Sequence, residues 1–306
     1  MSTPFETTSP EAIQDRILAA PGARRPSTTA YFIYYLRHKP LGTIGLGIVV
    51  LMITIAIFAP LIAPNSYQEQ NYEAVRAAPN LSFPFGTDQF GRDIFSRVIY
   101  GARISMIVGF LAVIVGTGAG ALIGLVSGYF MGKLDAIVQR LVDMWMSFPD
   151  LILALTIVAV FGNTIPNVIL AIAATIMPRG VRVIRSAVIS IREMDYTTAA
   201  RSIGASDLRI MLRHVMPNTI APFLIIMSSM FGNAILTEAG LSFLGLGIAE
   251  PTPSWGRMLT GQAAQYMVTA PWILIFPGLA ITITVLGFAF AGDALRDILD
   301  PKLRGR

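Results

Sequence analysis

The stretch Arg103–Ser127 reads RISMIVGFLAVIVGTGAGALIGLVS. It is long and apolar enough to cross a lipid bilayer as a helix, since about 20 mainly apolar residues suffice. Small residues recur at every fourth position along it and just beyond it: Ala112, Gly116, Gly120, Gly124 and Gly128. This spacing places them on one helix face, where another helix can approach closely. The pattern predicts tight helix packing, and a mobile gating contact is the alternative.

The composition of the whole chain is that of a membrane protein. Of its 306 residues, 54% are hydrophobic and 13% are charged, whereas a soluble domain carries about 25% charged residues. Cysteine is absent, which excludes disulfides and thiolate metal sites. The two histidines, His38 and His214, lie far apart, so we expect no metal or catalytic centre built from histidine. The net charge of +5 indicates basic cytoplasmic loops rather than a surface for nucleic acid.

Six apolar stretches predict an all-α polytopic membrane protein with six transmembrane helices. They are Leu41–Ala63, Arg103–Ser127, Ala136–Phe161, Pro166–Met177, Asn218–Leu241 and Pro271–Ala291. The fourth stretch is short by itself, and we expect it to extend past Pro178 into Arg179–Ile191. The first is too long for a secretory signal and begins only near Leu41, so it is predicted to be a lasting anchor.

The basic residues set the orientation. Most of the 23 lysines and arginines lie before the first span, between the second and third, in Arg179–Arg213 and in the C-terminal tail. The positive-inside rule therefore favours a cytoplasmic position for both termini. The predicted organisation is a cytoplasmic N-terminal segment (1–40), a first membrane helix (41–63), an external segment (64–102), a five-helix core (103–293) that includes a polar loop at 195–217, and a cytoplasmic tail (294–306).

The polar loop is predicted to form a helix–turn–helix bend. Asp195 can cap a short helix that runs through Ser202, and Gly204 breaks it. A second helix can start at Ser206 or Asp207 and run to Met216, after which Pro217 opens the fifth span.

The surface of this bend suits a protein partner. Small residues, Ala199, Ala200 and Gly204, allow close approach, while Arg201, Arg209 and Asp207 add charge at the rim. From spacing alone, docking to a protein and lying flat on anionic lipid headgroups are equally consistent.

Two carboxylates in or near the third span are candidates for a translocation path. A charge within a membrane must face a cavity or pair with a cation, so Asp143 and Asp150 could line a path that senses a peptide ammonium. The alternatives are structural. Asp143 could pair with Arg140 one turn back, and Asp150 could cap a helix that restarts after Pro149.

On the external side, several polar and aromatic residues are candidates for a gate or for docking a partner: Asp88, Arg92, Asp93, Arg97, Glu238 and Trp255. The structural alternatives are simpler. Asp93 and Arg97 have the spacing of a local ion pair, and Glu238 could satisfy backbone groups of the loop after it. Trp255 and Trp272 fit interfacial anchoring.

Four motifs in order along the chain resemble the peptide/nickel branch of ABC importer permeases. The first is Gly86-Thr87-Asp88-x-x-Gly91-Arg92-Asp93-x-x-Ser96-Arg97, and the second is the coupling motif Ala199-Ala200-x-x-x-Gly204 followed by Ile210 and Met216-Pro217. The third is Leu241–Gly247 with Pro253-x-Trp255-Gly256, and the fourth is Gly292-Asp293-x-Leu295-Arg296-Asp297-x-Leu299-Asp300-Pro301. The coupling motif departs from the family form at Thr198, where glutamate is usual, and at Met216, where leucine is usual.

The resemblance implies a type I ABC importer permease fold with a cytoplasmic coupling helix, closest to the second permease of dipeptide, oligopeptide or glutathione importers. It implies a bacterial inner-membrane chain that works with a homologous second permease, two cytoplasmic ATPases and an external solute-binding protein. By the same resemblance, Ala199, Ala200, Gly204 and Pro217 form the scaffold that docks an ATPase. The other candidates for this contact lie in the same loop: Asp195, Thr198, Arg201, Asp207 and Arg209.

This chain itself is expected to bind no cofactor and to catalyse no reaction. It lacks a Gly-x-x-x-x-Gly-Lys-[Ser/Thr] phosphate loop, so ATP and Mg are expected on the partner ATPases. A nickel-complex importer of the same branch is the alternative. A stand-alone secondary transporter would normally show internal repeats, and no convincing repeat relates the two halves. A membrane enzyme would need a metal or nucleophile constellation that is missing.

Overall fold

The computed structural model describes residues 40–260, 263 and 265–299. Their regular structure is helical apart from one isolated β-bridge between Thr87 and Asp93, so the all-α class is confirmed. Five helices are long and apolar enough to cross a membrane, or six if a bent pair counts as one span. The predicted N-terminal segment lies outside the described residues except for Pro40.

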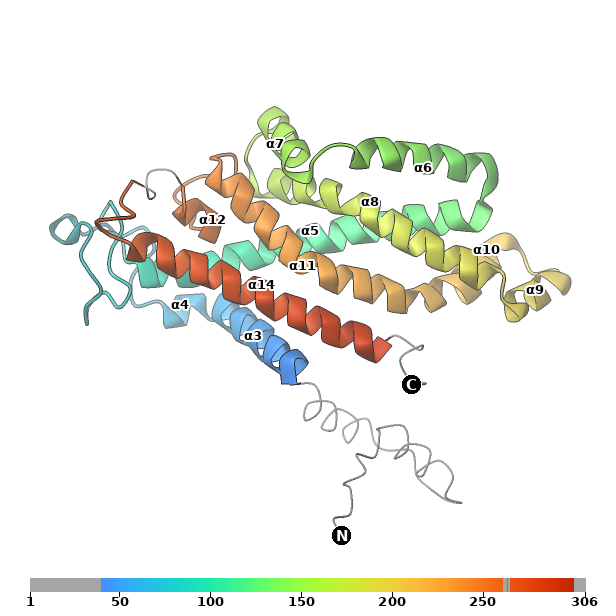
Figure 1. Ribbon diagram of the computed structural model, residues 1–306, viewed down its shortest axis with the longest axis horizontal. Helices are drawn as coiled ribbons and strands as arrows, with labels where there is room; N and C mark the ends of the chain where they lie inside the picture. The colour runs from blue at the N-terminus through green and yellow to red at the C-terminus, as the bar shows by residue number, and fades with distance from the viewer. Residues whose placement is uncertain (1–39, 261–262, 264, 300–306) are drawn as a thin grey trace, which may run out of the picture.

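The long helices form an elongated bundle with irregular segments at one end and a short helical bend at the other (Figure 1). The long elements are α3 (Pro40–Ile57), α5 (Ile94–Phe130), α6 (Gly132–Met146), α7 (Asp150–Phe161), α8 (Ile165–Arg192), α11 (Ile220–Phe243) and α14 (Trp272–Leu299). The short elements are α4 (Ala59–Ile62), η1 (Tyr72–Ala74), α9 (Asp195–Ser202), α10 (Asp207–Ile210), η2 (Met211–Val215), η3 (Met216–Thr219) and α12 (Trp255–Met258).

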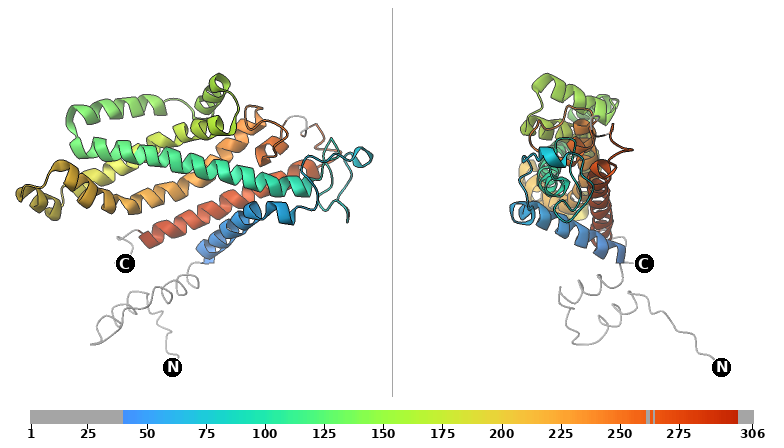
Figure 2. Two further views of the ribbon diagram at one scale, coloured as in Figure 1. Left: turned by 180° about the vertical axis from the view of Figure 1, so that it is seen from behind. Right: turned by 90° about the vertical axis from the view of Figure 1, so that its left-hand side faces the viewer.

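The glycine face of α5 packs directly on α8, and the two helices run side by side in Figures 1 and 2. A Cβ atom added at any of the four glycines would lie less than 3.0 Å from a backbone carbonyl of α8. The carbonyls belong to Ala173, Met177, Val181 and Arg185, in the order of Gly116, Gly120, Gly124 and Gly128. The predicted packing role is therefore confirmed, and α8 is the partner helix.

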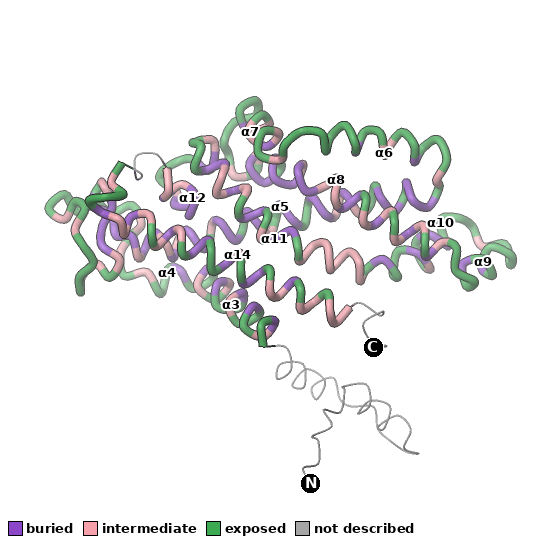
Figure 3. Tube along the Cα trace, viewed as in Figure 1, coloured by how far each residue is buried: buried purple, intermediate pink, exposed green. Residues whose placement is uncertain are grey.

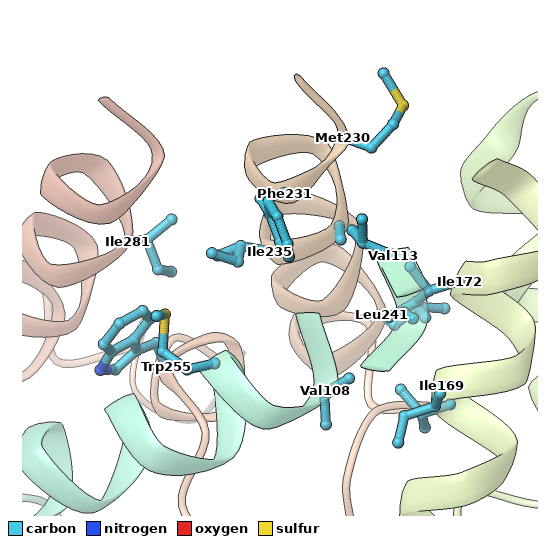
Figure 4. Packing of buried hydrophobic residues seen from close by; sticks show 14 of the residues in the cluster. Val108, Val113, Ile169, Ile172, Met230, Phe231, Ile235, Leu241, Trp255 and Ile281 are labelled. Atoms are coloured by element: carbon cyan, nitrogen blue, oxygen red, sulfur yellow. The ribbon is translucent and has the colours of Figure 1, made fainter. Parts of the chain in front are cut away.

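Buried side chains of α3, α5, α7, α8, α11, α12 and α14 form the main core. Figure 4 shows Val108 and Val113 of α5, Ile172 of α8 and Ile235 of α11 meeting there. Figure 3 shows burial along α5, α8 and α11, whereas α6 is exposed over most of its length. In the most apolar segment of α8, 61% of the residues are buried, whereas in that of α3 only 22% are buried. The helix α8 therefore lies at the centre of the bundle.

Several helix boundaries differ from the predicted spans. The third span is a pair of helices bent by 90° between Met146 and Asp150. Pro149 lies at this break, and a proline disfavours helical backbone in the residue before it. The second span begins at Ile94, nine residues before Arg103, because the side chain of Asp93 caps the helix.

Pro178 and Pro217, which stand at the boundaries of predicted spans, both lie within continuous helices. The fourth span runs through Pro178 to Arg192 as expected, although a proline costs one backbone hydrogen bond. Pro217 does not open the fifth span, which is a helix from Asp207 to Phe243 with a π-helical stretch at Met211–Val215. The bend and the fifth span therefore form one mechanical unit.

Replacing Gly120 by alanine is expected to destabilise the protein, because the new methyl group would overlap backbone atoms of α8. Overpacking of this kind costs about 1–3 kcal/mol. Gly118 is a matched control on the same helix, since a Cβ there meets nothing within 4 Å. Thermal unfolding of the detergent-solubilised protein should show a lower Tm for Gly120→Ala only. Equal Tm values for the two variants would contradict the role of the glycine face.

Candidate functional site

The short helix α9 begins directly after the long helix α8. Its first residue is Asp195, and its N-cap position is occupied by Met194, so the prediction that Asp195 caps the helix is wrong. The connection is held by the backbone N–H of Thr197, which donates to the Met194 carbonyl, and by its hydroxyl, which donates to the Ile191 carbonyl at 3.1 Å. These bonds hold the start of α9 against the end of α8.

Gly204 ends α9 as predicted. Its φ of +82° lies in the left-handed region that glycine adopts without strain. The N–H of Gly204 donates to the Arg201 carbonyl, and the N–H of Ala205 donates to the Ala200 carbonyl. Such bonds satisfy the last carbonyls of a helix and allow the chain to reverse. The helix–turn–helix bend predicted from the sequence is therefore present.

A second hydrophobic cluster anchors this bend to the bundle. It joins residues of α5 and α8 to residues of the bend: Leu125, Tyr129, Ile184, Val188, Ile191, Ala200, Ile210, Met211 and Val215. Ala200 is only 7% exposed, so it packs inward and does not offer a surface to a partner, contrary to the sequence prediction. The inner side of the bend is therefore packed against α5 and α8.

The outer surface of the bend carries the remaining candidate residues, all of them exposed: Asp195, Thr198, Ala199, Arg201, Gly204, Asp207, Arg209 and Pro217. Exposed apolar side chains lie among them, and Ile203 (86% exposed) and Leu208 (60%) are the most open. No sequence pattern identified these two residues. Exposed apolar side chains rimmed by polar ones mark a surface that meets another protein or a membrane.

Tyr129 provides a polar link between α5 and the bend. Its hydroxyl lies 2.8 Å from Oδ1 of Asp207, to which it donates a hydrogen bond, and the Arg192 guanidinium lies 5.8 Å from its ring centre. Tyr129 and Asp207 also line a groove beside the bend together with Phe130, Arg192, Arg201, Ala205 and Ser206. No sequence signal identified Tyr129, because its partner lies 78 residues further along the chain.

The two carboxylates of the bent third span pair with α8. Asp143 Oδ1 lies 2.5 Å from Arg182 Nη2, so its predicted pairing with Arg140 is wrong. Asp150 Oδ2 lies 2.6 Å from Arg179 Nη2. Asp150 is the first residue of the helix that restarts after Pro149, and Pro149 occupies the N-cap position, so the predicted capping by Asp150 is wrong. The structure thus brings each carboxylate to an arginine of the central helix.

The four external charged candidates form a buried cluster. Asp88 lies 2.6 Å from Arg92 Nε and 3.7 Å from Arg97 Nε, so the predicted Asp93–Arg97 pair is wrong. Asp93 instead accepts hydrogen bonds from the N–H groups of Phe95 and Ser96. None of the four charged residues is more than 5% exposed. Their contacts order the segment before α5.

Glu238 of α11 and Trp255 of α12 are fully buried. The Glu238 carboxylate accepts hydrogen bonds from Ser105 Oγ at 3.0 Å and Ser242 Oγ at 2.8 Å, so its predicted bonds to backbone groups are wrong. Trp255 donates from Nε1 to the Val98 carbonyl at 2.9 Å and packs in the core, so it is not an interfacial anchor. Both residues hold the segment after α11 against α5.

Trp272, the other predicted anchor, is half-buried and donates from Nε1 to the Thr87 carbonyl at 3.3 Å. Within residues 40–260, 263 and 265–299, no three histidine, aspartate or glutamate side chains are arranged to hold a metal ion.

Tyr129→Phe is expected to loosen the bend, since it removes one hydrogen bond to a carboxylate, a contribution of about 1–2 kcal/mol. Amide hydrogen exchange in residues 195–207 should become faster. Tyr196→Phe is the matched control, because Tyr196 lies on α9 and its side chain is 40% exposed. Equal exchange rates in the two variants would show that the Tyr129–Asp207 bond does not hold the bend.

Glu238→Ala is expected to lower the Tm strongly, because the buried hydroxyls of Ser105 and Ser242 lose their hydrogen-bond acceptor. Each unsatisfied hydroxyl lowers the free energy of unfolding by about 1–3 kcal/mol. Glu238→Gln keeps an acceptor oxygen and should have a smaller effect. Thermal unfolding of both variants in detergent tests this order, and a larger loss for Glu238→Gln would contradict it.

Comparisons with known proteins agree with the geometry. The family of binding-protein-dependent transport system inner membrane components matches residues 120–305, and the N-terminal TM domain of oligopeptide transport permease C matches residues 27–79. The dipeptide transport system permease protein DppC of Alkalihalophilus pseudofirmus is 44% identical over 272 residues, which cover 88% of each chain. The glutathione transport system permease protein GsiD of Shigella sonnei is 45% identical over 260 residues, which cover 84% of this chain and 85% of the relative.

These similarities extend over most of the chain and include the bend that joins α8 to α11. The resemblance seen in the four sequence motifs is therefore confirmed. The chain belongs to the family of binding-protein-dependent transport system inner membrane components and is a permease of an ABC transport system.

Proposed function

We propose that the chain is one of two homologous permease subunits of an ATP-driven importer that moves dipeptides or oligopeptides, with glutathione in the same class, across the bacterial cytoplasmic membrane. The substrate class is supported by relatives that carry the names of dipeptide and glutathione transport permeases. The observation that carries the mechanism is the α9–α10 bend, which is exposed outside and packed inside on α5 and α8.

In this proposal an ATPase subunit binds the exposed face of the bend. Ile203, Leu208 and the charged rim would contact the ATPase, while Ala200 and Ile210 would pass its movement to the bundle. Since the bend continues into α11 without a break, closure of the two ATPases would also rotate the fifth span. This coupled movement would alternate access to the two sides of the membrane.

The proposed orientation places the bend and both termini in the cytoplasm. Figure 1 supports a common side, because α3 begins and α14 ends toward the end of the bundle that carries the bend. Basic residues gather in the same regions of the sequence. The external segment before α5 and the segment around α12 lie at the opposite end, where a solute-binding protein would deliver the substrate.

The chemistry of ATP hydrolysis is assigned to partner chains. We propose two cytoplasmic ATPase subunits that bind ATP and Mg, a second permease subunit and an external binding protein. The permease subunit itself would bind no cofactor and would act as a non-catalytic transmembrane component. Its outer surface would contact membrane lipid.

Gly204→Trp is expected to uncouple peptide uptake from ATP hydrolysis, because it would place a large ring on the exposed tip of the bend. A Cβ at Gly204 meets nothing within 4 Å inside this chain, so the obstruction would act on a partner. Gly204→Asn is the control for backbone strain, since asparagine tolerates positive φ. The ratio of uptake to ATP hydrolysis in proteoliposomes that contain the full importer should fall for the tryptophan variant. Normal uptake by Gly204→Trp would refute the coupling role.

A further inference from the structure

Three aspartate–arginine pairs join the bent third span to the central helix. The pairs are Asp135–Arg185, Asp143–Arg182 and Asp150–Arg179, with N–O distances of 2.6, 2.5 and 2.6 Å. The arginines follow one another at three-residue intervals on α8, so they lie along one side of that helix. The side chains form a ladder of alternating charge between α6–α7 and α8.

The pairs differ in their exposure. The Asp135 and Arg185 side chains are 11% and 29% exposed, and Asp135 also accepts a hydrogen bond from Ser127. The Asp143 and Arg182 side chains are 63% and 47% exposed, and those of Asp150 and Arg179 are 42% and 37% exposed. The Asp135–Arg185 pair is therefore part of the packing between α6 and α8. The Asp143–Arg182 and Asp150–Arg179 pairs each have one side that no residue within the described part of this chain covers.

The open pairs lie deep in the bundle. Arg179 is at the middle of the 28-residue helix α8, so it is about 20 Å from either end at a rise of about 1.5 Å per residue. A half-exposed charge at this depth is costly against lipid and is found facing a bundle interior or a water-filled cavity. The open side of the two pairs must therefore face water or another protein.

A polar stripe continues from these pairs toward the α9–α10 bend. Ser186 and Ser190 are exposed on α8, one and two turns beyond Arg182. The opposite side of α8 is buried, where Val181, Ile184 and Val188 pack toward α5. The polar side thus forms a continuous route from the middle of the bundle to its cytoplasmic end.

We propose that this stripe lines the translocation passage and binds the charged groups of the solute. The inference rests on the proposed import function and adds the residues that recognise the substrate. Asp143 and Asp150 would accept an ammonium group, and the guanidinium forks of Arg179 and Arg182 match the geometry of a carboxylate. Because both pairs are half-exposed, a zwitterionic peptide can exchange with the paired side chain without leaving a buried charge unpaired.

Accessibility of the stripe can be measured directly, because the chain contains no cysteine. Ser186→Cys in the full importer is expected to react with a membrane-impermeant methanethiosulfonate reagent supplied from the cytoplasmic side. Leu279→Cys is the matched control, because Leu279 is also half-exposed (50%) but lies on α14 among apolar residues. Failure of Ser186→Cys to react, with or without ATP, would show that a protein surface covers the stripe and would overturn the proposal.

Selectivity is tested by two opposite charge changes. Asp150→Asn should lower the ratio of alanyl-lysine uptake to alanyl-glutamate uptake, and Arg179→Gln should raise it. Each shift is expected to be about tenfold if the lost contact contributes about 1.4 kcal/mol. A purely structural role would reduce uptake of both dipeptides equally in both variants, and that result would refute the recognition role.

The two readouts separate this inference from the proposed function. If the wild-type importer hydrolyses ATP but takes up neither dipeptide, the proposed peptide function fails, while the cysteine result still reports on the passage. If uptake is normal and both the labelling and the charge variants show no effect, the passage lies elsewhere in the bundle.

Discussion

The contact between the glycine face of α5 and the backbone of α8 is the constraint on which the rest of the structure depends. Four glycines allow the two helices to meet with no side chain between them. In a membrane, where lipid is as apolar as leucine, such close backbone contact is a main source of helix association. It holds α8 at the centre of the bundle, and from that position α8 carries both the bend and the arginine ladder.

The position of α8 gives its two sides different roles. Its apolar side is buried against α5 and continues into the small cluster around Ala200 and Ile210. Its polar side carries arginines that pair with the bent third span. A movement of the bend would therefore reach the proposed passage through a single rigid helix, without a long chain of loop contacts.

Much of the fold was predictable because membrane insertion depends on local properties of the sequence. Length and apolarity identified the long helices, the four-residue glycine spacing identified a packing face, and Gly204 marked the bend. Several of the wrong predictions concern pairing. Asp143 contacts Arg182 rather than Arg140, and Asp88 rather than Asp93 pairs with Arg97. Spacing rules select the neighbour one turn away, whereas an opposite charge more distant in the sequence can displace that neighbour once the chain has folded.

In the candidate site, too, local features were predictable from the sequence and contacts between distant residues were not. The motif around Ala199 and Gly204 identified the bend, but the same motif did not show that Ala200 faces inward. Tyr129 was missed entirely, because a tyrosine at the end of an apolar helix has no distinctive pattern until its hydroxyl meets Asp207. Exposure of Ile203 and Leu208 likewise depends on how the bend is oriented.

By itself, the sequence determined the membrane class, the approximate helices, the glycine face and the family motifs, because each of these depends on residues close together along the chain. Only the tertiary structure decided which helix fills the glycine groove, that Ala200 faces inward and which charges pair. These features depend on groups tens of residues apart, and their energies depend on burial and direction, which exist only once the helices have packed.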